Sequence, residues 1–163
     1  MEQVHHHKTR PSRHFDSLEQ EVFLSIWRTY DRLRLMEDEL FSTYDLSPQQ
    51  YNVLRLLNSV KPQSMHTLEL ASRLVSRAPD ITRMLNKLEQ RALIVRERPV
   101  DNRRVVLVAI TTQGCELLEK MYKPICECHA LQLGHLTTEQ LKALIVLLRE
   151  ARLPHEKELS EWI

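Results

Sequence analysis

Residues 64–111, SMHTLELASRLVSRAPDITRMLNKLEQRALIVRERPVDNRRVVLVAIT, decide the fold of this chain. At their centre, apolar residues recur at i, i+3, i+4 and i+7, which predicts an amphipathic helix carrying Ile81, Met84, Leu85 and Leu88 on one stripe. We expect Ser76 to be its N-cap, with Pro79 in the first turn, where a missing N–H has no cost. The opposite face carries mostly hydrogen-bonding side chains and almost no acid, and is suited to a groove: Pro79, Thr82, Arg83, Asn86 and Gln90.

The segments on either side of this helix complete a recognisable unit. Residues 67–74 are predicted to form a shorter helix with Leu68, Ala71 and Leu74 facing inward, and residues 72–77 form the turn between the two helices. Downstream, residues 93–98 and 105–110 are predicted to be two strands, joined by turn residues that include Pro99 and Asp101. This order predicts a winged helix-turn-helix with a two-stranded β wing, whose tip carries Arg103 and Arg104.

Four stretches in the right order and spacing resemble the MarR family of transcriptional regulators, over about residues 15–150. They are LSPQQYNVL at 46–54, TLELA at 67–71, TRMLNKLE at 82–89, and DNRR at 101–104 leading into VAITTQG at 108–114. Each stretch alone is weakly specific, but the four together are specific. Two positions depart from the family pattern. Ala92 stands where the family usually has Gly, and Asn102 stands where it usually has the wing Asp, with Asp101 one residue earlier.

The chain is expected to be mainly α, as one domain of four segments. Residues 1–14 are a flexible, polar N-terminal arm, and residues 15–46 a long dimerisation helix, free of Pro and Gly up to Tyr44. Residues 47–111 are the winged helix-turn-helix region, opened by a capping box at Ser47 to Gln50. Residues 112–163 form C-terminal dimerisation helices, with Pro124 kinking or breaking the first and a second capping box at Thr137 to Gln140. By resemblance, the first helix pairs with the C-terminal helices of a second subunit.

Charge is distributed unevenly along the chain. The net charge is only +1 over 163 residues, but residues 64–111 hold nine Lys or Arg against five Asp or Glu, a net charge of +4. The remainder has a net charge of −3. Duplex DNA binding requires a local basic face rather than a basic protein, so the distribution favours DNA as a partner.

Several classes of function are excluded by what the sequence lacks. There is no apolar run of about 18 residues and no secretory signal, so no membrane span and a cytoplasmic location are expected. The sequence contains no nucleophile–base–acid arrangement and no nucleotide-binding loop, so we do not expect an enzyme or a cofactor. We expect His5 to His7 to be part of a disordered tail and not of a metal site, because three adjacent histidines do not form a closed site by themselves.

The three cysteines lie in one predicted helix. Cys126 and Cys128 are about 200° apart on that helix and cannot bridge each other there. One hypothesis is a redox switch in which Cys126 or Cys128 forms a disulfide between two subunits. A buried, unreactive thiol is the more common alternative for each of them, and no role is predicted for Cys115.

The predicted DNA contacts follow from the geometry of a helix in the major groove. Arg83 and Asn86 are the candidates for base edges. Around them we expect methyl or backbone contacts from Pro79 and Thr82, phosphate contacts from Arg77 and Lys87, and a minor-groove contact from Arg103 or Arg104. A solvated surface charge is the alternative for each residue, and it is the preferred reading for Arg73 and Arg91.

Together these features predict a sequence-specific repressor that acts as a homodimer on a pseudo-palindromic operator, with half-sites about 34–36 Å apart. The resemblance also implies modulation by an oxidant or by a small aromatic effector, for which the candidate ligand-binding residues are Trp27, Tyr30, Met36, Tyr51 and His66. Core packing is the alternative for each of these. The rival function is a winged-helix protein-interaction module without DNA binding.

Overall fold

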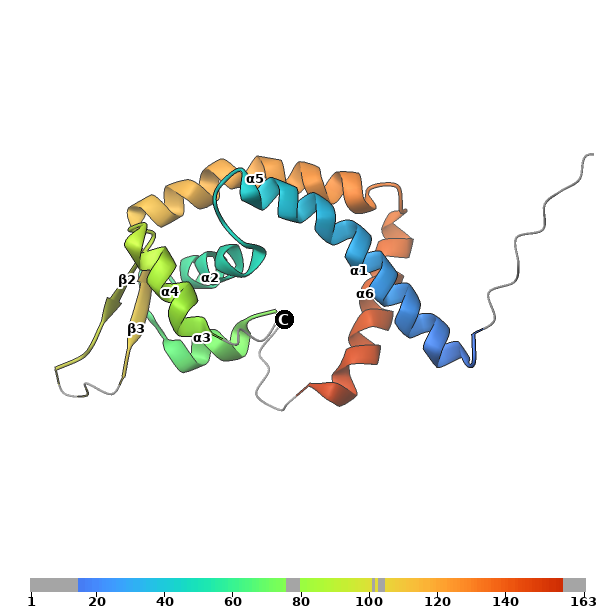
Figure 1. Ribbon diagram of the computed structural model, residues 1–163, viewed down its shortest axis with the longest axis horizontal. Coiled ribbons are helices and arrows are strands. Elements are labelled where there is room, and N and C mark those ends of the chain that lie inside the picture. The colour runs from blue at the N-terminus through green and yellow to red at the C-terminus, as the bar shows by residue number, and fades with distance from the viewer. Residues whose placement is uncertain (1–14, 76–79, 101, 103–104, 157–163) are drawn as a thin grey trace, which may run out of the picture. The chain divides into compact units, whose positions relative to one another are not determined.

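The computed structural model describes residues 15–75, 80–100, 102 and 105–156 of the 163-residue chain (Figure 1). It divides into two compact units, one up to Leu35 and one from Met36 onward. The elements follow one another as α1 (Leu18–Ser42), α2 (Pro48–Ser59), β1 (Met65–His66), α3 (Thr67–Arg73), α4 (Ile81–Gln90), β2 (Ile94–Glu97), β3 (Leu107–Ile110), α5 (Thr112–Leu133), α6 (Thr138–Arg152) and a 3₁₀ turn (Leu153–His155). This is a mainly α winged-helix fold, as predicted; residues 1–14, the predicted arm, lie outside the described part.

Both predicted capping boxes are present. At the start of α2, the Ser47 N–H donates to Gln50 Oε1 at 2.8 Å, and the Gln50 N–H donates to Ser47 Oγ at 3.2 Å. At the start of α6, Thr137 and Gln140 repeat the pattern at 2.9 and 3.2 Å. Each box satisfies two backbone donors that the helix itself leaves unpaired, which fixes where the helix begins.

The start of α4 differs from the prediction. The helix begins at Ile81, and its N-cap is Asp80, whose Oδ1 accepts from the Arg83 N–H at 2.8 Å. The Asp80 carboxylate accepts a hydrogen bond from a backbone N–H that the helix leaves unpaired, as a serine hydroxyl would. It also places a negative charge at the positive end of the helix dipole. The N-cap of α4 is therefore Asp80 and not the predicted Ser76. Ser76 and Pro79 themselves lie outside the described part of the chain.

The inward face of α3 also differs. Leu68 is 86% exposed and Ala71 is exposed, whereas Leu70 is fully buried and Leu74 is 8% exposed. The buried pair is spaced i, i+4, so one narrow stripe anchors this seven-residue helix. A helix of two turns offers too few residues for the apolar pattern to select the correct stripe from sequence.

The wing belongs to a three-stranded antiparallel sheet in the order β1–β3–β2. β2 and β3 form the predicted hairpin, with Ile94 opposite Ile110 and Arg96 opposite Val108. The additional strand is β1, where Met65 pairs with Val108 and His66 with Leu107. A two-residue strand carries no periodic signal, so the sequence predicted only the two wing strands.

The core of the second unit lies where α2, α4, the sheet and α5 meet. Its fully buried or nearly fully buried members come from each of these elements and include Leu54, Leu57, Leu85, Leu88, Ile94, Val108 and Met121. α5 continues through Pro124, which therefore does not break the helix. Because α4 contributes Leu85 and Leu88 to this core, its other face is held toward solvent.

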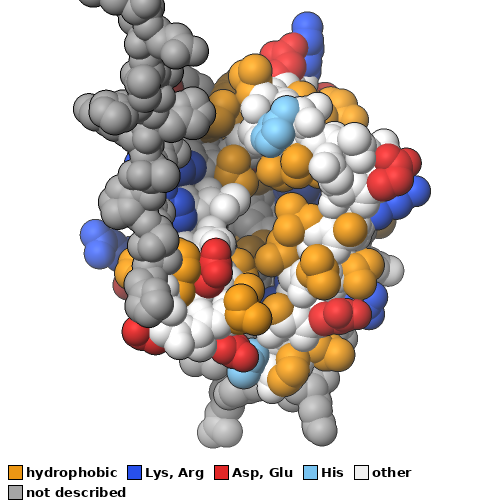
Figure 2. All heavy atoms as spheres, turned by 90° about the vertical axis from the view of Figure 1, so that its right-hand side faces the viewer, with side chains coloured by type: hydrophobic (Ala, Val, Ile, Leu, Met, Phe, Trp, Pro, Cys, Tyr) orange, Lys and Arg blue, Asp and Glu red, His pale blue; other side chains and the backbone are white. Residues whose placement is uncertain are grey.

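Two helices leave apolar side chains in water. In α6 no residue is buried, and Ile145 and Leu147 are 66% and 63% exposed. In α1, Trp27 and Tyr30 are 61% and 60% exposed, and Phe41 is its one buried residue. Hydrophobic side chains are widespread on the face that Figure 2 shows.

Within the described ranges, no helix is long and apolar enough to cross a membrane. Nor do those residues bring together three or more His, Cys, Asp or Glu side chains that could hold a metal ion.

Candidate DNA-binding interface

The outer face of α4 carries the polar residues singled out in the sequence. Thr82, Arg83, Asn86 and Lys87 are all exposed, while Leu85 and Leu88, on the opposite side, are 1% and 0% exposed. The helix thus presents one arginine and one asparagine, the side chains that pair with guanine and adenine edges, from a rigid support. The four other predicted contacts, Arg77, Pro79, Arg103 and Arg104, lie outside the described residues.

An ion pair ties α4 to the wing. Arg96 Nε in β2 donates to Glu89 Oε2 in α4 at 3.0 Å, and Arg96 Nη2 contacts the same oxygen. The hydrogen bond from Arg96 lowers the pKa of the Glu89 carboxyl, against an opposing effect of burial. Because Glu89 follows Asn86 by one turn, this pair links α4, close to its exposed polar face, to the first wing strand.

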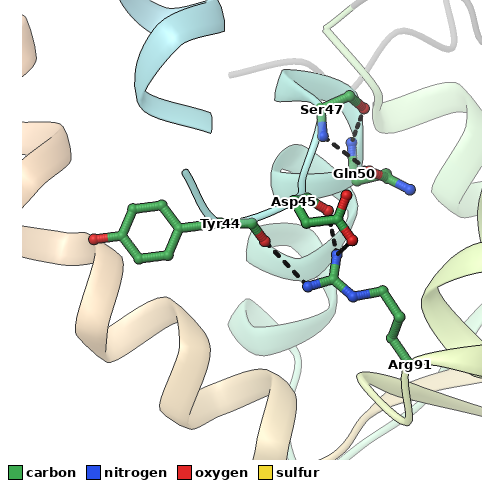
Figure 3. Close-up of polar contacts among 5 residues, drawn as sticks. All are labelled: Tyr44, Asp45, Ser47, Gln50 and Arg91. Carbon is green, nitrogen blue, oxygen red and sulfur yellow. Dashed lines mark hydrogen bonds and ion pairs between the residues drawn. The ribbon is translucent and has the colours of Figure 1, made fainter. Parts of the chain in front are cut away.

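A second tie joins the end of α4 to the loop before α2. The Arg91 guanidinium donates from Nη2 to the Tyr44 carbonyl at 3.1 Å and from Nη1 to the Asp45 carbonyl, and Nη1 lies 3.7 Å from Asp45 Oδ2 (Figure 3). Asp45 has a φ of 51°, a left-handed conformation that aspartate tolerates. Arg91 was predicted to be a solvated charge. That prediction is wrong, because two backbone carbonyls of the loop before α2 accept hydrogen bonds from its guanidinium. Arg73, which was predicted in the same way, forms a partly exposed ion pair on α3, with its Nη2 3.0 Å from Glu69 Oε1.

Ala92 adopts the left-handed conformation that glycine usually adopts at the C-terminal end of a helix. Its φ is 55°, its N–H donates to the Glu89 carbonyl at 2.8 Å, and the Leu93 N–H donates to the Leu88 carbonyl at 3.0 Å. These are the two hydrogen bonds of a Schellman motif, with alanine in the left-handed position. The departure from the family pattern therefore leaves the geometry of the helix end unchanged and adds backbone strain.

A pocket of about 440 Å³ lies between α2 and α5, within the second unit. Its lining comes from one stripe of each helix: Tyr51, Arg55, Asn58 and Ser59 from α2, and Cys115, Leu118, Glu119, Tyr122, Ile125, Cys126 and His129 from α5. Burial raises the pKa of Tyr51, and the nearby Arg55 opposes this shift. The pocket therefore combines two tyrosines with side chains of both charges, Arg55 and Glu119.

The five predicted ligand-binding residues are not gathered in this pocket. Tyr51 lines it, whereas His66 lies in β1 and Met36 is 36% exposed on α1. Trp27 and Tyr30 lie in the N-terminal unit. The sequence signal that was missed is the i, i+4, i+7 spacing of Tyr51, Arg55 and Asn58, which places three polar or aromatic side chains on one face of α2.

Comparison with known proteins assigns the family. Residues 46–106, from the start of the winged helix-turn-helix region to the second wing strand, match the MarR family. A MarR transcription factor of known structure from Planctomyces limnophilus is 51% identical, with a TM-score of 0.67 over 83% of this chain and 98% of that one. The transcriptional repressor MprA of Escherichia coli (strain K12) is 29% identical over 136 residues, 82% of this chain and 77% of MprA.

The fold is also that of a MarR variant from Escherichia coli solved in complex with operator DNA. The two share 23% identity and a TM-score of 0.72, over 83% of this chain and 98% of the other. At this level of identity the likeness concerns the fold alone. The 51% identical relative, which this chain spans almost completely, shows more: this protein belongs to the MarR family of transcriptional regulators.

Proposed function

We propose that this protein is a sequence-specific repressor that binds a pseudo-palindromic operator as a homodimer. The observation that carries the proposal is the outer face of α4, where Thr82, Arg83, Asn86 and Lys87 are exposed on a helix anchored by the buried Leu85 and Leu88. A helix of this kind reads base edges in the major groove, and each good pair is worth about 1–3 kcal/mol of discrimination.

The roles in DNA binding divide by chemistry. Arg83 and Asn86 read bases, Thr82 contacts a methyl group or the backbone, and Lys87 contacts a phosphate. The proposal assigns further contacts to Arg77, Pro79, Arg103 and Arg104, with one wing arginine in the minor groove. The likeness to a repressor and to a regulator solved on operator DNA supports this assignment, because a dimer seated across an operator blocks other proteins from the same grooves.

Exposed apolar side chains support the homodimer. α6 has no buried residue yet carries Ile145, Val146 and Leu147, each more than half exposed. α1 exposes Phe23 and Trp27, whose rings meet edge to face with centroids 6.1 Å apart. Apolar surface of this extent marks an interaction site in a soluble protein. We assign it to pairing of α1 with α5 and α6 of a second subunit, which sets two copies of α4 about 34–36 Å apart.

The pocket between α2 and α5 supports control by a small molecule. Its volume of about 440 Å³ is that of a small-ligand site, and its walls include Tyr51, Tyr122 and the cationic Arg55. A ligand held there would press on both helices, and α5 continues directly from the second wing strand. We therefore propose a small aromatic effector that changes the spacing of the two recognition helices.

The rival proposal is a winged-helix module that binds proteins and not DNA. It has no need for an arginine and an asparagine side by side on the exposed face of α4. The salt dependence of the binding affinity distinguishes the two proposals. Only DNA binding releases condensed counterions, so only its affinity falls steeply as the salt concentration rises. Catalysis is not part of the proposal, because the family is one of transcriptional regulators.

Selection of bound sequences from random duplexes tests the proposed function. We expect the full chain to enrich a two-fold-related motif, and Arg83→Ala and Asn86→Ala each to weaken binding to it by roughly tenfold or more. Lys120→Ala, which removes one charge from an exposed position on α5, is the matched control and should bind as the parent does. Enrichment of no motif, or equal loss in all three variants, would refute sequence reading by α4.

A further inference from the structure

The loop at the end of the wing carries an exposed valine. We use the name wing tip for residues 98–106, which join β2 to β3 at the end of the hairpin that projects from the second unit (Figure 1). Val100 in this loop is 92% exposed, the largest fraction among the large hydrophobic side chains that the structure describes. A side chain this exposed adds nothing to the core, so its methyl groups are available to a partner.

Two backbone hydrogen bonds shape the wing tip. The Asn102 N–H donates to the Pro99 carbonyl at 3.2 Å, which closes a four-residue turn with Val100 at its second position. The Val105 N–H then donates to the Asn102 carbonyl at 3.1 Å. Because Asn102 is donor in one bond and acceptor in the other, the two bonds follow each other directly along the loop. Val100 therefore lies at a corner of the chain that the backbone defines.

The base of the wing is joined to the neighbouring helices on both sides. Next to β3, the Val106 carbonyl accepts hydrogen bonds from the Thr67 N–H at 3.1 Å and from Thr67 Oγ1 at 3.2 Å. In β2, Arg96 is paired with Glu89 of α4. These contacts connect the wing to α3 and α4. In the proposed complex, the duplex that occupies α4 is therefore the partner that the wing tip meets.

The charge of the wing tip also favours DNA as the partner of Val100. Residues 98–106, RPVDNRRVV, hold three arginines and one aspartate, a net charge of +2. Arg98 is exposed, whereas Arg103 and Arg104 lie outside the described residues. Basic loops are drawn to the phosphates, and proteins that enter the minor groove commonly place an apolar side chain against the bases there. A valine between arginines in sequence fits that combination of contacts.

We infer that Val100 is a specificity-determining residue, whose methyl groups pack on the floor of the minor groove and select A·T over G·C pairs there. In this groove a G·C pair differs from an A·T pair by the guanine N2 amino group, which projects from the floor. That group blocks the close approach of a methyl group, and once covered it would lack an acceptor. Adenine presents a C2–H at the same place, which a methyl group can contact. The inference rests on the proposed DNA-binding function and adds which base pairs the wing prefers.

Groove width is a second source of preference for A·T pairs. Arginines favour the narrow minor groove of A·T-rich DNA through its negative potential, without contact to a particular base edge. A substitution at Val100 separates the two sources, because it leaves every charge of the wing tip in place. Val100→Thr replaces one methyl group with a hydroxyl at nearly constant shape, and the hydroxyl can accept a hydrogen bond from the guanine amino group.

Duplexes with altered minor-groove edges test the inference. In the motif enriched by selection, each flanking base pair would be changed in turn to A·T, G·C or inosine·C, and the Kd of the full chain measured. Inosine·C keeps the major-groove edge of G·C but lacks the amino group. For the parent we expect a flanking position in each half-site at which G·C binds about tenfold more weakly than inosine·C or A·T. For Val100→Thr, the difference between G·C and inosine·C there should fall below about twofold. If the parent has no such position, or if Val100→Thr keeps the full difference, Val100 does not read the minor groove.

A matched variant and the salt dependence distinguish direct contact from a displaced wing. Val95→Thr makes the same exchange within β2, at a side chain that is 45% exposed, and should keep the parent's difference between G·C and inosine·C. Parent and Val100→Thr should also show the same slope of log affinity against log salt, since no charge changes. An equal loss in Val95→Thr, or a changed slope, would overturn the direct role of Val100.

The same measurements separate this inference from the proposed function. If the parent selects no sequence from random duplexes, the proposed function fails and the inference fails with it. If the parent selects a motif and discriminates by flanking base pairs equally well with valine or threonine at position 100, only the inference fails.

Discussion

Arg91 Nη2 donates to the backbone carbonyl of Tyr44 at 3.1 Å, and so ties the end of α4 to the loop that precedes α2 (Figure 3). Because Asp45 offers its carbonyl and its carboxylate to the same guanidinium, the tie holds two consecutive residues of the loop. The orientation of α4 is therefore set from both sides, by this loop and by the wing strand that carries Arg96.

Removing the guanidinium should loosen α4. We expect Arg91→Met to lower the free energy of unfolding by about 1–2 kcal/mol, because two carbonyls lose a charged donor. Urea denaturation measures this change. Lys123→Met, which removes only an exposed i, i+4 pair, should change it by less than about 0.5 kcal/mol. A loss no larger than that of the control would show that the tie contributes nothing to stability.

Ala92→Gly should stabilise the protein. Ala92 has a φ of 55°, where an L-residue is strained by about 1 kcal/mol and glycine is not, although glycine gains more freedom in the unfolded chain. We expect a net gain of about 0.5 kcal/mol and a higher Tm. Ala143→Gly, inside α6, is the matched control and should lose about 1 kcal/mol. If both variants are less stable than the parent, Ala92 is not strained at the end of α4.

The pair of Glu89 and Arg96 should make stability depend on pH in a defined direction. The pKa of Glu89 is lowered in the folded state, so its contribution is complete above the ordinary glutamate pKa and is lost as the pH falls through the lowered value. Both side chains are partly exposed, which limits the effect to about 0.2–1 kcal/mol. Parent and Glu89→Gln should differ at neutral pH and converge in acid. Equal stability at both pH values would rule out a contribution from the pair.

Ile145→Glu should weaken the proposed dimer. A charge placed on the apolar surface of α6 would have to be desolvated in the proposed interface, whereas in a monomer it stays in water. Light scattering over a concentration series should show a monomer at concentrations where we expect the parent to be a dimer. Gln113→Glu adds the same charge at an exposed polar position on α5 and should leave the mass unchanged. A dimeric Ile145→Glu would place the interface elsewhere.

What could be predicted from sequence was local. The apolar stripe of α4 and the capping boxes at Ser47 and Thr137 depend on residues within one or two turns, and the structure confirms them. The N-cap of α4 was missed because Ser76 and Asp80 both satisfy the local rule, and the choice between them depends on where the core seats the helix.

The remaining features depend on contacts across the chain. Arg91 could not be matched to Tyr44 and Asp45, because no periodic pattern links positions about fifty residues apart. The α2–α5 pocket required the two helices to be placed side by side. The family resemblance predicted the overall fold, whereas these particular contacts depend on how distant parts of the chain pack together.

Affinity for duplex DNA as a function of salt distinguishes sequence-specific DNA binding from the rival function. Using the motif enriched by selection and a scrambled duplex of equal length, binding would be followed by fluorescence anisotropy from about 50 to about 200 mM salt. We expect the logarithm of affinity to fall linearly with the logarithm of the salt concentration for both duplexes, and the motif to bind more tightly throughout. An affinity that does not change with salt, or equal affinity for the two duplexes, would show that the protein is not a sequence-specific DNA-binding protein.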